Sequence, residues 1–213
     1  MEVYDGTNKK RNKLFGVVLC SVFLLTSCLP IEVSACTKAY YDWTWDNSIN
    51  MKNLSIRVYS SNFADTVSVE ALNAWNMITP IFVHYVNYGS NITSGNIETI
   101  NVHEKDLTGT TIGQTHLYRK GSIGQYVESS ISSSNKDICQ ARIYLDPSLL
   151  NTTDAKKAKT ITHELGHAFG MMHPIINGCE VECIMQQNKS GFASTEIKQH
   201  DKNNMIAKWG AFK

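Results

Sequence analysis

The chain has 213 residues, of which 42% are hydrophobic and 18% are charged, and its formal net charge is +1. This composition is typical of a globular protein and excludes collagen-like, coiled-coil and disordered chains. No internal repeat divides the sequence, so one domain is expected after an N-terminal export segment.

The N-terminus has the pattern of an export signal. Four basic residues between Lys9 and Lys13 precede an apolar run, Leu14 to Leu25. This run is too short for a transmembrane helix and suits a secretory signal. Leu25-Thr26-Ser27-Cys28 resembles a lipobox, which predicts residues 1–27 as the signal peptide and Cys28 as a lipidated first residue. Cleavage after Ala35, within Val33-Ser34-Ala35, is the alternative and would give a freely secreted protein.

Export predicts an extracellular protein, either a cell-surface lipoprotein or a secreted one. Without residues 1–27, the chain has 16 basic and 17 acidic residues, which gives a net charge of −1. A near-neutral domain is not expected to bind nucleic acid or to carry a polybasic membrane patch. The only expected membrane contact is a lipid anchor at Cys28, and we expect a monomer.

The cysteines left after export suggest disulfide bonds. Cys20 lies in the signal and Cys28 is the lipid site, and an even number in an exported domain predicts two disulfides. The short loop favours Cys179–Cys183, with Cys36–Cys139 as the second pair. A second zinc site held by these thiols is the alternative, although paired CxxC spacing is absent.

The remaining chain predicts an α+β fold, with a mixed sheet and packed helices. Residues 28–52 form a polar and aromatic N-terminal segment that we expect to wrap the edge of a domain spanning residues 53–213. Alternating apolar and polar residues predict five strands at residues 54–59, 81–86, 97–102, 114–118 and 141–145. Helices are expected from Thr66 or Ser68 to Thr79, from 154 to 169, and from Ser194 or Thr195 to Trp209.

The stretch from His163 to His173 reads HExxHxxGxxH. On a helix, His163 and His167 project from one face and can bind the same metal ion. Gly170 can end the helix in a left-handed conformation, which allows the chain to turn back and deliver His173 as a third ligand. Three protein ligands and an open position are typical of catalytic zinc. Glu164 is offset from the metal-binding face and is placed to hold a water molecule.

These residues resemble the metzincin clan of zinc endopeptidases, and within it the matrixin-like branch. The resemblance is carried by the full motif, by Met185 twelve residues beyond His173, and by Asp201 eight residues before Trp209-Gly210. It implies a zincin-like fold with a twisted mixed five-stranded sheet, an active-site helix and a C-terminal helix. It also implies that Met185 lies in a tight turn beneath the metal.

The sequence departs from animal matrixins at several positions. Pro174 replaces their usual Ser, and Gln187 replaces the Tyr that other branches use as an extra ligand. We find no counterpart of their second, structural zinc site, so His84, His103 and His116 are expected to be partly exposed or hydrogen-bonded. Residues 28–53 are too short for an inhibitory propeptide. Cys36 could cap the zinc, although a disulfide is favoured.

The resemblance implies an extracellular zinc-dependent endopeptidase acting on proteins or peptides. His163, His167 and His173 would bind one Zn²⁺, which acidifies a water molecule, and Glu164 would act as the catalytic base. The alternatives are a non-catalytic zinc-containing surface binding protein and a hydrolase of cell-wall peptides. The sequence neither indicates nor excludes Ca²⁺, and it does not reveal the natural substrate.

Overall fold

The computed structural model describes residues 39–49, 54–63, 74–76, 78, 83–88, 99–132, 134, 137–174, 183–186 and 196–211. All of them belong to one compact unit, Cys36–Lys213. The signal segment and the candidate lipid site at Cys28 lie outside these ranges, as does most of the helix predicted between Thr66 and Thr79. No helix among the described residues is long and apolar enough to cross a membrane.

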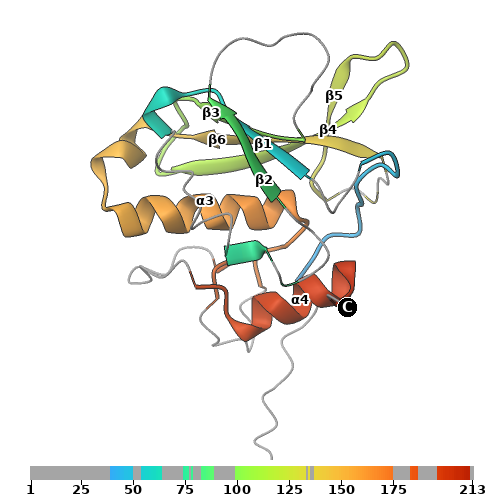
Figure 1. The fold of residues 1–213 in the computed structure, drawn as a ribbon. Coiled ribbons are helices and arrows are strands. Elements are labelled where there is room, and N and C mark those ends of the chain that lie inside the picture. The colour runs from blue at the N-terminus through green and yellow to red at the C-terminus, as the bar shows by residue number, and fades with distance from the viewer. Residues whose placement is uncertain are drawn as a thin grey trace, which may run out of the picture. The chain divides into compact units, whose positions relative to one another are not determined.

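Six strands form one mixed sheet in the order β2-β1-β3-β6-β4-β5 (Figure 1). The neighbouring pairs among β1 (Leu54–Val58), β2 (Val83–Tyr88), β3 (Ile100–Glu104) and β6 (Ile138–Leu145) are parallel. In contrast, β4 (Gly113–Lys120) is antiparallel to both β6 and β5 (Tyr126–Ser129). The predicted α+β class and its mixed sheet are therefore confirmed.

The prediction of five strands omits β5. The five predicted strands correspond to β1, β2, β3, β4 and β6, with ends shifted by a few residues. The omitted strand, β5, follows a tight turn in which the Gly121 N–H donates to the Gln125 carbonyl oxygen at 2.8 Å. β5 has only four residues, YVES, and lies in a Gly- and Ser-rich stretch. So short and polar a segment shows no alternation of apolar and polar residues that would predict a strand.

The sheet has one apolar face, and the strand register defines it. Thr115 and Leu117 alternate with outward residues on β4, and they stand opposite Ile143 and Ala141 of β6. The same face continues through Val102 of β3 and onward to β1. It is lined by fully or almost fully buried side chains: Leu54, Ile56, Val58, Ile100, Val102, Leu117, Ala141, Ile143 and Leu145.

The helix α3 (Asp154–Ala168) packs on this face, along β4 and β6 (Figure 1). It begins at Thr153, whose side chain accepts a hydrogen bond from the backbone N–H of Lys156, and Asp154 suits the positive end of the helix dipole. An apolar stripe runs along the helix, because Ile161, Leu165, Ala168 and Phe169 are fully buried and Ala158 is half-buried. Two short 3₁₀ helices, Ser61–Phe63 and Pro147–Asn151, complete the connections.

The last helix, α4 (Gln199–Trp209), begins later than predicted. Residues 196–198 are not helical, and Lys198 is extended at φ −84° and ψ 168°. The Asp201 carboxylate accepts the backbone N–H of Lys198 at 3.1 Å, which fixes the helix start at this point. Gly210 ends the helix as predicted, with φ 85°.

Residues 39–49, part of the predicted N-terminal segment, contribute to the hydrophobic core. Trp43 is fully buried and Trp45 is 3% exposed. Trp45 forms a parallel bridge with Ile138, and the Asp46 backbone N–H donates to the Ile138 carbonyl at 2.7 Å. The domain boundaries proposed from the sequence stay predictions.

The disulfides proposed from the sequence are not supported. Cys139 and Cys183 are free thiols, and their expected partners, Cys36 and Cys179, lie outside the described residues. The Cys139 thiol instead approaches the Tyr118 carbonyl oxygen at 3.5 Å, and Cys183 is buried.

Gly170 occupies the left-handed conformation predicted for the end of α3, with φ 86°. A Cβ atom at this position would lie 2.3 Å from Cε of Lys208, whereas a Cβ at Gly124, with φ 84°, would meet nothing within 4 Å.

Gly124→Ala should lower the free energy of unfolding by about 1–2 kcal/mol, the cost of the left-handed backbone alone. Gly170→Ala should lower it further, and urea denaturation measures both. Equal losses would contradict a close contact with Lys208.

Candidate metal site

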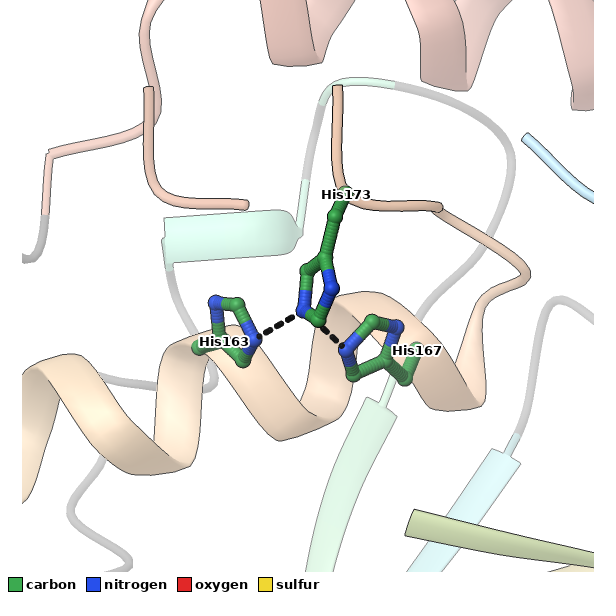
Figure 2. A group of neighbouring side chains, drawn as sticks. All are labelled: His163, His167 and His173. Atoms are coloured by element: carbon green, nitrogen blue, oxygen red, sulfur yellow. Dashed lines mark hydrogen bonds between the residues drawn. The ribbon is translucent and has the colours of Figure 1, made fainter. Parts of the chain in front are cut away.

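The three histidines of the motif meet at one point (Figure 2). His163 and His167 project from α3, and His173 lies on the segment that follows the end of the helix. The Nε2 atom of His173 lies 3.0 Å from Nε2 of both His163 and His167. Tetrahedral zinc with bonds of about 2.0–2.1 Å would place such nitrogens roughly 3.4 Å apart. The observed spacing is therefore close to that of a metal centre.

The backbone contacts of two histidines determine their tautomers. Nδ1 of His163 lies 2.8 Å from the Ile184 carbonyl oxygen, and Nδ1 of His167 lies 2.9 Å from the Met171 carbonyl oxygen. A carbonyl oxygen only accepts, so each Nδ1 donates, and in the neutral ring each Nε2 presents a lone pair. Both lone pairs face Nε2 of His173, which carries at most one proton and can donate a hydrogen bond to only one of them. A cation at the centre would satisfy all three nitrogens.

Burial keeps these rings neutral. It lowers the pKa of His163 to about 4, with the neighbouring His173 and Lys159 adding to the effect. Burial and the two other imidazoles lower the pKa of His167 to about 3, and burial also lowers the pKa of His173. A neutral imidazole is the form that binds a metal, so the site fits a divalent cation at neutral pH.

Glu164 lies beside the histidines but faces β4. The residue is 5% exposed, and its Oε2 lies 2.7 Å from the Thr115 hydroxyl, which also approaches the Glu164 carbonyl oxygen at 3.0 Å. Burial raises the pKa of Glu164 to about 7, while the hydroxyl of Thr115 opposes that shift. The role of Thr115 is not indicated by the sequence, because it depends on which face of β4 packs on α3.

The turn at Ile184 and Met185 lies against the metal-site helix. Met185 is 2% exposed, and a Cβ atom on Gly166 would lie 2.3 Å from its Sδ atom. The side chain of Met185 thus contacts the helix directly at Gly166, which lies between His163 and His167 in the sequence. The turn at Met185 agrees with the one that the resemblance implies, and its place beneath a metal stays a prediction. Gln187 lies outside the described residues.

Asp201 connects this turn to α4. Its Oδ2 atom accepts the backbone N–H of Ile184 at 3.0 Å, in addition to that of Lys198. Because the Ile184 carbonyl accepts from His163, the two helices are joined through one residue of the turn. Asp201 is 1% exposed, and burial raises its pKa.

A second cluster of metal-binding residue types lies nearby. One donor atom each of Cys183, His200 and Asp201 lies within 4.8 Å of the others. Asn204 Oδ1 accepts from the Ala39 N–H, so its Nδ2 donates to His200 Nε2 at 3.1 Å. Among the described residues, however, His200 Nδ1 and Asp201 Oδ1 are buried without a hydrogen-bond partner, so the hydrogen bonding of this cluster is incomplete.

His103 and His116 are not part of the three-histidine cluster. His103 stacks on Tyr59 with a centroid distance of 4.4 Å, and His116 Nδ1 lies 2.7 Å from Glu128 Oε1. His103 and His116 each contact the ring of Tyr144. They form a row across the face of the sheet that is opposite α3. His84 lies in β2, of which the backbone alone is described.

His103 should contribute to acid sensitivity. Burial, and secondarily Arg142, lower its pKa from 6.5 to about 4, so protons bind the unfolded chain more tightly. The free energy of unfolding should therefore fall as pH decreases from about 6.5 to about 4. His103→Phe keeps the ring stack but cannot titrate, so urea denaturation should show a shallower fall. Tyr144→Phe alters the same row and should retain the wild-type slope; identical slopes for all three proteins would contradict this assignment.

No family model matches the chain, and no curated protein matches it. Among solved structures, the crystal structure of myroilysin aligns with a TM-score of 0.45 at 13% identity, covering 83% of this chain and 93% of that one. A second structure of myroilysin aligns with a TM-score of 0.40 at 16% identity, covering 76% of this chain and 81% of that one. Similarities at this level assign neither a family nor an activity to the chain.

Proposed function

We propose that this chain is an exported zinc-dependent endopeptidase of the metzincin clan, with matrixin-like features. The observation that carries the proposal is the convergence of three neutral imidazole nitrogens beside a buried carboxylate, Glu164. His163, His167 and His173 would bind the ion. A zinc ion there supplies a Lewis acid that polarises a peptide carbonyl and acidifies water.

Glu164 is placed to move the protons of the reaction. Its raised pKa means that its carboxylate accepts a proton more readily than an exposed glutamate does. It can take a proton from the attacking water and pass it to the leaving amine. The hydroxyl of Thr115 limits the directions in which the carboxylate can point, since it binds Oε2 at 2.7 Å.

An extended peptide could bind along the start of β4. In the described part of the chain, β5 pairs with β4 only from Leu117 to Lys120, so Gly113–His116 have no strand partner on that side. Backbone groups at a free strand edge can bind a peptide as an added strand. Thr115 lies in this stretch and contacts Glu164, so such a peptide would pass the carboxylate.

The setting of the enzyme follows from the export signal. The protein would act outside the cell as a monomer, either anchored through a lipid on Cys28 or released after cleavage at Ala35. Cleavage of a peptide library, with and without a chelator, tests the activity, and cell-wall peptides in the same experiment test that narrower substrate class. A zinc-loaded protein that cleaves nothing would favour a non-catalytic surface binding protein.

Glu164→Gln should remove the proton acceptor without removing a metal ligand. We expect kcat to fall by about 10²–10⁴-fold while the zinc content stays at the wild-type level. Peptide cleavage assays and elemental analysis measure the two quantities. Glu104→Gln is the matched control, because Glu104 is an exposed glutamate whose carboxylate bonds Ser60 and Asn62 and not the histidines. Wild-type kcat in the Glu164→Gln protein would overturn the proposed mechanism.

Thr115→Val should remove the hydrogen bond to Glu164 with little change in volume. We expect kcat to fall roughly tenfold, which corresponds to about 1.4 kcal/mol. The hydroxyl lowers the pKa of Glu164, so its loss should also move the acid limb of the pH–rate profile to higher pH. Thr115→Ser keeps the hydroxyl and should restore both quantities. A Val variant with the wild-type rate and profile would exclude this role.

A further inference from the structure

The third histidine of the site is held differently from the first two. His163 and His167 are fixed by α3, whereas His173 lies in residues 172–174, which have no regular secondary structure. At its helix end the segment is held by the Met171 N–H, which donates to the Gly166 carbonyl at 2.8 Å. The position of His173 therefore also depends on the contacts that this segment makes with other parts of the chain.

Residues 39–41 supply that second support. Tyr40 and Met171 form an antiparallel bridge. The Tyr41 N–H donates to the Gly170 carbonyl at 2.8 Å, and the Met172 N–H donates to the Ala39 carbonyl at 2.8 Å. The second bond involves the residue directly before His173. Two hydrogen bonds with residues 39–41 thus hold the backbone at Gly170 and Met172, directly before the third proposed ligand.

Two residues of α4 hold residues 39–41 in turn. Asn204 Oδ1 accepts the Ala39 N–H at 2.9 Å. The ammonium group of Lys208 donates to the carbonyl oxygens of Tyr41 at 2.7 Å and Trp43 at 2.6 Å. It also lies 5.0 Å from the ring centroid of Trp43 and 4.7 Å from that of Trp209. Charge-assisted bonds to two carbonyls are stronger than neutral ones, so Lys208 dominates this attachment.

We propose that Lys208 is a positioning residue for His173, acting through residues 39–41 on the backbone that presents the third metal ligand. This inference rests on the proposed metal site, not on peptide cleavage. The support requires that residues 39–43 stay in the mature chain after export. Both predicted cleavage sites, before Cys28 and after Ala35, leave residues 39–43 in the mature chain, so either form would retain the support.

Lys208→Met tests the proposal, because it keeps the length of the side chain and removes the donors. We expect the Kd for zinc, measured by competition with a chelator, to rise roughly tenfold or more, as is typical when a support of a metal ligand is lost. Lys208→Arg keeps the charge and the donors and should lie closer to wild type. Lys202→Met, at an exposed position of the same helix, should match wild type.

Amide hydrogen exchange separates positioning from general stability. In zinc-free Lys208→Met, the Met172 amide should exchange faster than in zinc-free wild type, while the Leu165 amide within α3 should be unchanged. If Lys208→Met does not fold, Asn204→Ala weakens the same segment at Ala39 and should raise the Kd in the same direction. An unchanged Kd in the folded variant would overturn the positioning role alone. Absence of zinc binding by the wild-type protein would overturn the metal site as well.

Discussion

The hydrogen bond between His163 Nδ1 and the Ile184 carbonyl joins the metal-site helix to the C-terminal part of the chain. It fixes which nitrogen of His163 faces the centre, and it requires the turn at Ile184 to stay against α3. Asp201 holds that turn from the other side through the Ile184 N–H. One residue of the turn therefore transmits the placement of α4 to His163, a proposed metal ligand. Supports of this kind determine the orientation and basicity of ligands.

Different faces of the helix α3 contact different parts of the protein. Its apolar stripe packs on the sheet, while His163 and His167 face the site and Gly166 faces Met185 and Trp75. A side chain at Gly166 would collide with both of these neighbours, whose closest atoms lie 2.3 and 2.9 Å from a Cβ placed there. The middle of the helix is thus enclosed on several sides. This explains why the helix is almost fully buried from Thr160 onward, although its first turns carry three exposed or half-buried lysines.

Local sequence patterns predict what depends on local geometry. Helical spacing brings His163 and His167 together, and Gly170 ends the helix where the pattern indicates, so the three-histidine cluster follows from eleven consecutive residues. The partners from distant segments do not follow from any such pattern. Lys208 contacts Trp43 across 165 positions, and Thr115 reaches Glu164 across 49. A strand or helix period states which residues share a face, but not which element will cover it.

Burial has opposite effects on the two kinds of titratable group in the site. It lowers the pKa of His163 and His167 to about 4 and 3, and raises that of Glu164 to about 7. Both effects have the same cause, since a charge is disfavoured wherever water is excluded. The histidines are thereby kept neutral and able to bind a cation without first losing a proton. The glutamate is kept ready to accept one. A single physical condition, exclusion of water on both sides of α3, thus acts on the proposed ligands and on the proposed base.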